Sequence, residues 1–325
     1  MTTPYAIRHI TRFLYTSPVS ESVMELRMRP ATDGTQRCLQ FEVEVAPRAR
    51  VFAYRDFLGN WVHHFDIPRR HSQLTITARA QVQVDAPAAL PARLGDDAWA
   101  AVDGWAAGGD HWDFRQPSHF ATWSPALLDF VAGLGPGATR VADPLTTVRR
   151  VMAAIHDGFE YAPKSTRVDS PIDDALAARR GVCQDFTHVM IATLRRLGLP
   201  CRYVSGYMAP RPADDDATAA STIATHAWVE TFLPDLGWVG LDPTHNVEAG
   251  VRHVRVAIGR DYADVPPTRG TFKGTTASTL EVSVDVTPAE ALPTLDPAVI
   301  ETAWTAEAPP PADDERDRQM QQQQQ

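Results

Sequence analysis

The sequence lacks any apolar run that approaches the ~20 residues needed by a membrane-spanning helix. No apolar stretch follows the basic residues near the N-terminus, so no secretory signal is recognisable. An excess of positive charge is also missing, because 31 Lys and Arg stand against 40 Asp and Glu, a net charge of −9. Phosphate binding favours clustered cations. We therefore expect a cytoplasmic protein with neither a membrane nor a nucleic-acid partner.

Cysteine is scarce as well, with three residues in a chain of 325. Cys38, Cys183 and Cys201 are too few for a disulfide framework and too scattered for a zinc ribbon. The chain has no Cys-x-x-Cys or His-Glu-x-x-His motif, and His63 and His64 would point to opposite faces of a strand. The sequence thus predicts no metal and no cofactor. One intracellular Cys with His and Asp elsewhere is instead typical of a thiol nucleophile.

Composition and periodicity divide the chain into four parts. Polar and apolar residues alternate along residues 1–85, which predicts an antiparallel β domain. Residues 86–143 are rich in Ala, Pro and Gly and are expected to form a connecting region with short helices. Helical and then strand-like patterns predict a second domain over 144–290, with a mobile loop at Ala209–Ala220. The Pro-, Ala- and Gln-rich residues 291–325 are expected to be a disordered tail.

Cys183 lies in the first turn of a predicted helix. Apolar residues spaced mainly by three and four form one stripe over residues 182–197, and Gly198 ends the helix. A helix N-terminus carries about half a positive charge and unpaired N–H groups, which stabilise a thiolate and can hold an oxyanion. A buried structural cysteine is the commoner role for a free thiol. The helix start and the partners described next favour a nucleophile.

His226 and Asp242 lie on two predicted strands that form a hairpin. One register pairs Phe232 with Leu236 and places His226 directly opposite Asp242. A second register places Asp242 opposite Val229, about 10 Å along the strand from His226. A Cys-His-Asp triad therefore requires the first register or a bulge. An Asp beside an imidazole fixes its tautomer and stabilises its cation, whereas the alternative role of this Asp-Pro pair is to start a turn.

Three segments resemble the transglutaminase-like core, a papain-like α+β fold with a Cys-His-Asp triad. They are Gly181-x-Cys183, His226-Ala-Trp-Val-Glu230 and Gly237-Trp-x-x-Leu-Asp-Pro-Thr244. Residues 202–207 and 257–270 are similar to flanking segments of the core, the second of them to the closing segment of bacterial members, and residues 5–84 resemble the β-rich N-terminal region of those proteins. The resemblance implies an α+β protein in which an antiparallel β domain precedes a papain-like core. It also implies that Cys183, His226 and Asp242 form the triad.

The resemblance further implies a thiol enzyme that acts on a protein or peptide substrate. Cys183 would form a thioester from a glutamine or peptide amide. An amine would resolve the thioester by cross-linking, and water would resolve it by hydrolysis, as in an amidase or cysteine protease. The alternative is a non-catalytic binding scaffold that retains the fold. The sequence leaves the oligomeric state open.

Other residues near these motifs have two possible roles each. Gln184 is a candidate oxyanion donor, although the main-chain N–H of the nucleophile is the firmer one. Tyr161 and Trp228 are candidates to line the acyl pocket, and core packing is equally expected for them. Arg260 and Asp261 are expected to form an ion pair that braces the second domain.

Overall fold

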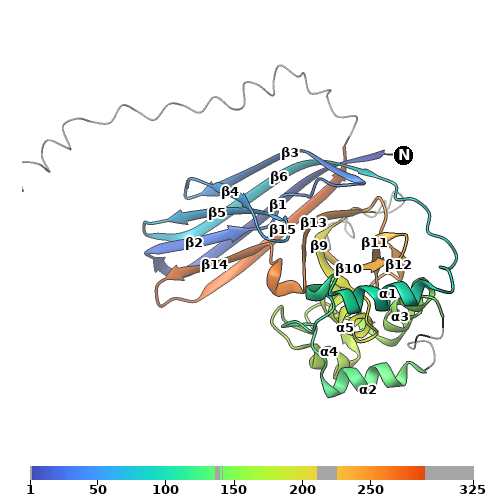
Figure 1. Ribbon diagram of the computed structural model, residues 1–325. Coiled ribbons are helices and arrows are strands. Elements are labelled where there is room, and N and C mark those ends of the chain that lie inside the picture. Colours follow the sequence, from blue (N-terminus) through green and yellow to red (C-terminus); the bar gives the residue numbers. More distant parts are fainter. Residues whose placement is uncertain (1, 136–139, 141, 211–224, 290–325) are drawn as a thin grey trace, which may run out of the picture. The chain divides into compact units, whose positions relative to one another are not determined.

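The computed structural model describes residues 2–135, 140, 142–210 and 225–289 of the chain (Figure 1). The expected tail at 291–325, and all but the first two residues of the expected mobile loop, lie outside the described residues. None of the helices described combines the length and the hydropathy that a bilayer crossing requires.

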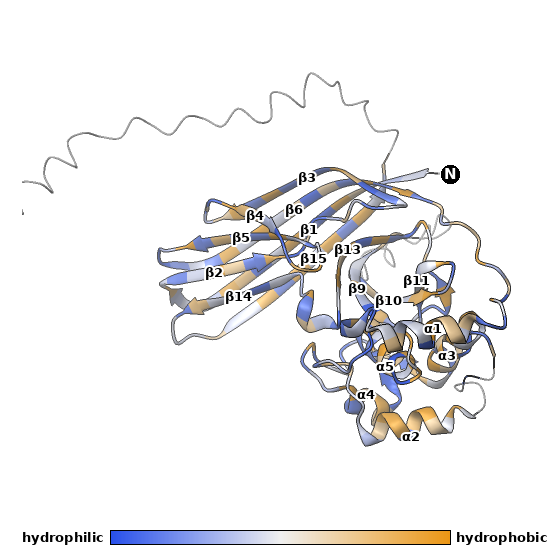
Figure 2. Ribbon diagram, viewed as in Figure 1, coloured by the Kyte–Doolittle hydropathy of each residue, from blue (hydrophilic) through white to orange (hydrophobic). Residues whose placement is uncertain are grey.

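The N-terminal β domain is antiparallel, as the alternation predicts, and it consists of two four-stranded sheets. Their strand orders are β15-β1-β6-β3 and β14-β2-β5-β4. The strands are β1 (Thr2–Val19), β2 (Glu21–Leu26), β3 (Gln36–Ala46), β4 (Phe52–Arg55), β5 (Trp61–Ile67), β6 (His71–Asp85), β14 (Thr268–Lys273) and β15 (Ser278–Pro288). Figure 2 shows hydrophilic and hydrophobic residues alternating along them. Val19 and Ile76 of one sheet share a buried cluster with Leu26 and Phe65 of the other.

Two strands of this domain come from the far end of the described chain. β14 pairs with β2, and β15 pairs with β1 from Tyr5 opposite Pro288 to Tyr15 opposite Ser278. The prediction that the second domain extends to residue 290 is therefore wrong for 268–288. Alternating polarity identifies a strand but not the sheet that it joins, because the pairing partner lies at the other end of the sequence.

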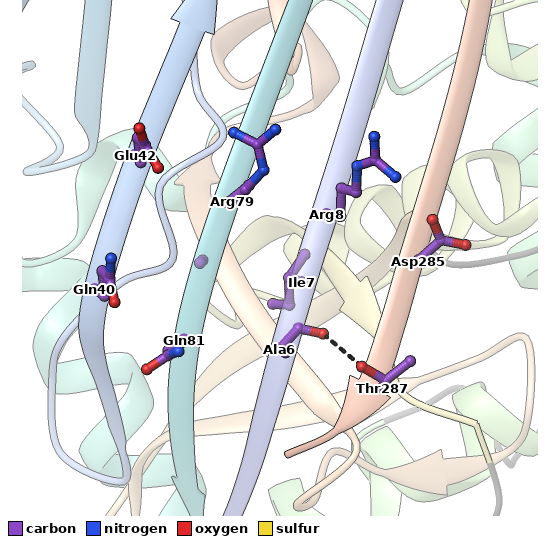
Figure 3. Close-up of a pocket in the computed structure, with 10 residues that line it drawn as sticks. Ala6, Ile7, Arg8, Gln40, Glu42, Arg79, Gln81, Asp285 and Thr287 are labelled. Atoms are coloured by element: carbon purple, nitrogen blue, oxygen red, sulfur yellow. Dashed lines mark hydrogen bonds between the residues drawn. The ribbon is translucent and has the colours of Figure 1, made fainter. Parts of the chain in front are cut away.

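Charged side chains cross the outer face of the first sheet in one row (Figure 3). The strand registers place Glu42 beside Arg79, Arg79 beside Arg8, and Arg8 beside Asp285. Each arginine thus has an acidic neighbour, and Arg79 also lies 3.4 Å from Glu44. The row is the solvated side of an antiparallel sheet whose other face is buried.

The second domain packs α3 and α5 against a five-stranded antiparallel sheet of order β12-β11-β10-β9-β13. Its elements are α1 (Ala98–Gly108), η1 (Trp112–Phe114), α2 (Pro125–Gly133), α3 (Pro144–Gly158), β7 (Glu160–Tyr161), α4 (Ile172–Ala178), β8 (Arg180–Gly181), α5 (Cys183–Arg196), β9 (Cys201–Met208), β10 (Thr225–Leu233), β11 (Gly237–Asp242), β12 (Val247–Glu248), β13 (His253–Gly259) and η3 (Tyr262–Asp264). Ile191 of α5 and Val229 of β10 belong to one buried core. The predicted α+β class is confirmed.

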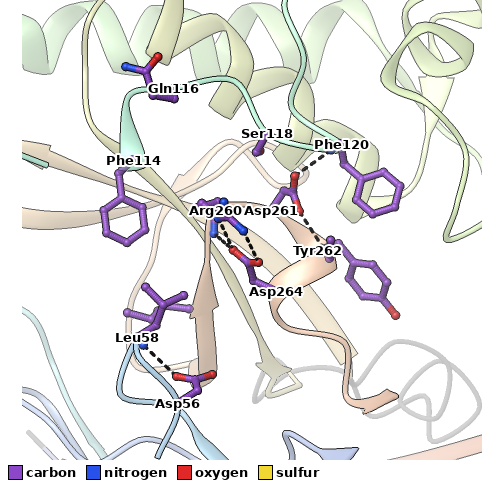
Figure 4. A network of polar contacts seen from close by, with 12 residues as sticks. Asp56, Leu58, Phe114, Gln116, Ser118, Phe120, Arg260, Asp261, Tyr262 and Asp264 are labelled. Atoms are coloured by element: carbon purple, nitrogen blue, oxygen red, sulfur yellow. Dashed lines mark hydrogen bonds and ion pairs between the residues drawn. The ribbon is translucent and has the colours of Figure 1, made fainter. Parts of the chain in front are cut away.

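Buried Arg195 of α5 holds the connecting region in place. Figure 4 labels four of the residues to which it donates, Phe114, Gln116, Ser118 and Arg260. The Arg195 guanidinium donates to five acceptors: the carbonyls of Phe114, Gln116, Cys201 and Arg260, and the Ser118 hydroxyl. Asp261 accepts the backbone N–H of Phe120 at 2.8 Å. The expected ion pair between Arg260 and Asp261 does not form, because Arg260 binds Asp264 at 2.9 Å and Asp261 caps η3.

Strand β13 joins the second domain to the β domain through two buried amide side chains. Asn60 donates from Nδ2 to the carbonyl of Ile258 and accepts the N–H of Ile258 at Oδ1, both at 2.8 Å. Gln36 makes the same pair of bonds with the backbone of Arg255, again at 2.8 Å. The amides act as extra peptide groups, which complete the hydrogen bonding of a strand edge that would otherwise be buried without partners.

Replacing Asn60 by Ala should destabilise the protein by about 2–3 kcal/mol, because it leaves the buried N–H and C=O of Ile258 unpaired. Urea denaturation of wild type and variant measures the difference. Gln40→Ala is the matched control, since the Gln40 side chain is exposed and makes no hydrogen bond within the described residues. Equal losses in both variants would contradict this account of Asn60.

Candidate active site

Helix α5 begins at Cys183, one residue after the predicted start, so the thiol lies in the first turn as the sequence predicts. The residue before it is Val182, which has no side-chain acceptor, so Asp185 folds back to accept the Val182 N–H at 2.8 Å. The same carboxylate oxygen accepts the Thr166 hydroxyl at 2.6 Å. A Cβ on Gly181 would lie 2.7 Å from Asp185, so glycine is required for this close approach.

This helix start leaves backbone donors next to the thiol. Neither Cys183 nor Gln184 uses its backbone N–H in a hydrogen bond within the described part of the chain. Both groups belong to the first turn, where N–H groups have no partner inside the helix. The thiol therefore lies at the positive end of the helix dipole, beside two donors that can receive a developing oxyanion.

His226 and Asp242 form a hydrogen bond across the β10–β11 hairpin. His226 Nε2 lies 2.8 Å from Asp242 Oδ2, and neither side chain is accessible to solvent. The other ring nitrogen of His226, Nδ1, is buried and has no aligned hydrogen-bond partner among the described residues. Burial alone would lower the pKa of His226, but the interactions with Asp242 and Cys183 outweigh it and raise that pKa to about 10.

The hairpin register differs from both registers considered from the sequence. Leu233 pairs with Gly237 and Val229 with Leu241. Continued by one residue, this register places Asp242 opposite Trp228 rather than His226. Asp242 reaches His226 along the diagonal, since residues two apart on a strand share a face. A loop of three residues sets this register, and within it Asp235 has a positive φ of 63°. Neither the expected direct pairing nor a bulge is needed.

Asp242 accepts hydrogen bonds at both of its oxygens. Oδ1 accepts the backbone N–H groups of Thr244 at 2.9 Å and His245 at 3.3 Å. Oδ2 accepts from the rings of His245 at 2.8 Å and His253 at 3.1 Å, besides His226. Burial would raise the pKa of Asp242, but the hydrogen bonds to the three imidazoles hold it well below its usual range. The carboxylate is therefore ionised at neutral pH.

Known proteins share this arrangement of domains. Residues 5–83 match the bacterial transglutaminase-like N-terminal region, and residues 136–243 match the transglutaminase-like superfamily. An uncharacterized protein of Mycobacterium leprae is 32% identical over 281 residues, which cover 86% of this chain and 96% of that protein. The chain belongs to the bacterial transglutaminase-like family. It therefore has the fold of a family of thiol enzymes.

Other relatives of this transglutaminase-like protein extend the comparison. An uncharacterized protein of Mycobacterium tuberculosis is 34% identical over 300 residues, 88% of this chain and 93% of that protein. A protein-glutamine gamma-glutamyltransferase of Pseudomonas aeruginosa is 31% identical over 128 residues, 37% of this chain and 19% of that enzyme. The crystal structure of a proposed cysteine protease from Cytophaga hutchinsonii has a TM-score of 0.66 at 19% identity, covering 90% and 93% of the two chains, so it shows the shared fold.

The remaining candidate residues of this transglutaminase-like protein have different surroundings. Gln184 donates its amide to the carbonyl of Val168 at 2.9 Å, so its side chain is engaged by the preceding loop. Trp228 is 2% exposed and stacks on His226, with ring centroids 6.1 Å apart. Tyr161 is partly buried, and its pKa is raised, mainly by burial and to a smaller extent by the neighbouring Cys183. Trp228 thus shields His226, and Tyr161 lies beside the thiol.

The other two thiols have surroundings unlike those of Cys183. Cys201 is fully buried on β9, and burial raises its pKa to about 12. Cys38 is partly buried in the β domain, and burial raises its pKa as well. Neither thiol forms a hydrogen bond with a histidine in the described structure.

Sequence reasoning missed His245, His253 and Tyr203 as parts of the site. Tyr203 is buried on β9, and its pKa is raised well above the usual range, mainly by burial and next by the neighbouring Cys183. His245 comes just after the Asp-Pro-Thr segment, and His253 opens β13. A histidine close behind a candidate triad Asp is a weak signal for His245. Nothing local marks His253, since only the fold brings β13 to the hairpin.

Gly181→Ala should destabilise the protein by about 1–3 kcal/mol and slow the alkylation of Cys183, because the added methyl group displaces Asp185 from the helix start. Urea denaturation and iodoacetamide kinetics measure the two effects. Gly158→Ala is the matched control, since a Cβ at the end of α3 meets nothing within 4 Å. Unchanged alkylation in Gly181→Ala would show that Asp185 does not organise this turn.

Proposed function

We propose that this protein is a thiol acyl-transfer enzyme with Cys183 as nucleophile, His226 as base and acid, and Asp242 as the group that orients His226. The observation that carries the proposal is the buried 2.8 Å bond between His226 and an ionised Asp242, beside a thiol at a helix start. A carboxylate in that position holds the imidazole in one tautomer and stabilises the cation that forms when His226 takes the thiol proton.

The proposed reaction begins when the Cys183 sulfur attacks the carbon of a glutamine carboxamide or peptide amide. The carbonyl π electrons move to oxygen, where the N–H groups of Cys183 and Gln184 receive the negative charge. When the carbonyl re-forms, the C–N bond breaks and His226 gives its proton to the departing nitrogen. The products of this half-reaction are ammonia or an amine and a thioester on Cys183.

The thioester is then resolved by a second nucleophile, from which His226 removes a proton. A primary amine gives a new amide and thus a cross-link, whereas water gives the free acid. The partial likeness to a protein-glutamine gamma-glutamyltransferase supports transfer to an amine. Hydrolysis is the simpler outcome, because water is abundant and needs no binding site of its own. We propose that both acceptors compete for one acyl-enzyme.

Cys183 should react with iodoacetamide at pH 6 at least ~10-fold faster than Cys38 or Cys201, because its proton can pass to His226 while burial keeps the other two thiols protonated. Peptide mapping by mass spectrometry after timed labelling measures each rate. In His226→Ala the advantage should disappear. Equal slow labelling of all three thiols in wild type would instead support a scaffold without thiol chemistry.

Incubation with glutamine peptides and a primary amine should give conjugates, deamidated peptides or cleavage products. Cys183→Ala should reduce every product by roughly 10³-fold or more, because it removes the sulfur on which the proposed thioester forms. Mass spectrometry of the mixture identifies the products and the ratio of amine to water transfer. Cys38→Ser is the control that removes a thiol outside the site and should leave the products unchanged. Products that persist in Cys183→Ala would refute the assignment.

A further inference from the structure

Three imidazole rings converge on one oxygen of Asp242. Nε2 of His226, Nδ1 of His245 and Nε2 of His253 lie 2.8, 2.8 and 3.1 Å from Oδ2. An ionised carboxylate only accepts hydrogen bonds, so each of these nitrogens carries a hydrogen. The catalytic scheme above uses one of the three rings, and the other two have no role in it.

The backbone fixes the tautomer of His253. Its Nδ1 accepts the N–H of Gly250 at 3.1 Å, and a backbone N–H can only donate. The ring proton of neutral His253 is therefore on Nε2, which points at Asp242. The side chain is 6% exposed, and its ring packs edge-on against Trp228 with centroids 5.2 Å apart. His253 is thus a neutral donor with a fixed orientation. Burial disfavours its charged form and lowers its pKa.

The same geometry argues against a metal ion at this cluster. Donor atoms of His226, Asp242 and His253 lie within 4.8 Å of one another, a spacing that a metal could bridge. A metal-bound imidazole normally donates from its second nitrogen to a carbonyl or carboxylate. Here the Gly250 N–H arrives at that second nitrogen and requires the proton to be on Nε2, the atom that would have to bind the metal. A hydrogen-bond network accounts for every contact.

His245 differs from His253 in its access to water. Its Nδ1 donates to Asp242 and its backbone N–H approaches the other carboxylate oxygen, so both ends of the residue hold the carboxylate. The side chain is 36% exposed, and its ring lies 5.1 Å from that of His226. A substitution at His245 therefore disturbs little packing.

Resting on the proposed function, we propose that His253 and His245 are positioning residues that share Asp242 Oδ2 with His226 and limit how tightly the carboxylate holds the His226 proton. Each added N–H points its positive end at the same oxygen and neutralises part of its charge. It also lies close to the His226 cation and repels it. Protonated His226 therefore gives its proton to a leaving amine more readily, because a less basic imidazole is a stronger acid when protonated.

Groups on the neighbouring elements complete the electrostatic surroundings. Cys183 of α5 faces His226, and Tyr161 of β7 and Tyr203 of β9 lie near that thiol. On the other side, His253 lines a cavity of about 430 Å³ together with Arg202, Glu230, Arg255, Asp33 and Asp85. Glu230 binds both arginines, at 2.5 and 2.7 Å, so the cavity presents paired charges to His253.

The test is an NMR titration of full-length protein labelled with ¹⁵N-histidine, in which ring nitrogen shifts report the tautomer and charge of each imidazole. Replacing His253 by Met removes the donor at similar volume and should raise the pH at which His226 loses its proton by about half a unit or more. His253→Gln keeps an N–H near the Nε2 position and should restore the wild-type midpoint. His245→Leu should move the midpoint upward, and His245→Asn should restore it.

Enzyme kinetics provide a second measurement, which would not change if His253 and His245 had a purely structural role. In His253→Met, kcat should fall several-fold with KM unchanged, because a more basic His226 is a poorer acid, while His253→Gln should keep wild-type kcat. Thermal unfolding identifies variants that do not fold. If His253→Met does not fold, His245→Leu and His245→Asn still test the sharing of Asp242, because the His245 side chain is exposed.

The two proposals fail in distinguishable ways. Wild-type protein with an uncharged His226 and an unreactive Cys183 would refute the proposed function. A wild type that shows the charged His226 and rapid labelling of Cys183, together with an unchanged or lowered midpoint in His253→Met and His245→Leu, would overturn the sharing of Asp242 and leave the function intact. Equal shifts in His253→Gln and His253→Met would also overturn it.

Discussion

A buried, ionised carboxylate is the constraint on which the site depends. Asp242 has no solvent exposure, and an isolated charge in such a place is strongly unfavourable. It is stabilised by five N–H donors from β10, from the turn after β11 and from the start of β13. The donors must be present together, because losing one leaves part of the charge unpaired. The network therefore fixes the hairpin, the following turn and β13 relative to one another.

The helix start imposes a second constraint of the same kind. Gly181 allows Asp185 to approach the chain, and the Asp185 carboxylate accepts the Val182 N–H. A Ser or Thr side chain at the cap position would not bind this N–H group. Because the cap comes from a residue further along the helix, the N–H groups of Cys183 and Gln184 keep no acceptor among the described residues. The thiol, the free N–H groups and the positive helix end then occupy one place. The position of the thiol and the unpartnered N–H groups beside it are consequences of one capping arrangement.

The β domain reaches the site through β13. Asn60 and Gln36 bind the backbone of β13 from one side, and His253 at its first residue binds Asp242. After η3 the described chain returns to the β domain as β14 and β15. A strand that belongs to the five-stranded sheet is thus held by the other domain. The two domains also share one buried core, which includes Tyr5 and Val82 of the β domain and Val254 of β13.

Local pattern was sufficient for much of this protein. The apolar stripe and Gly198 predicted a helix over residues 182–197, and alternation predicted an antiparallel β domain. Three motifs predicted the family, to which the chain belongs, and made Cys183, His226 and Asp242 the candidate triad. These features follow from local periodicity and capping, or from short motifs, which the sequence displays directly.

Tertiary structure decided the rest. The hairpin register differs from both registers considered from the sequence, and its loop contains a positive φ at Asp235. The assignment of 268–288 to the β domain followed from pairing with strands at the other end of the chain. The sequence by itself predicted the helix that carries Cys183, the antiparallel β domain and Cys183 as a candidate nucleophile. Only the fold decided that His245 and His253 join His226 at Asp242, because hydrogen bonds between distant strands depend on packing that no local pattern encodes.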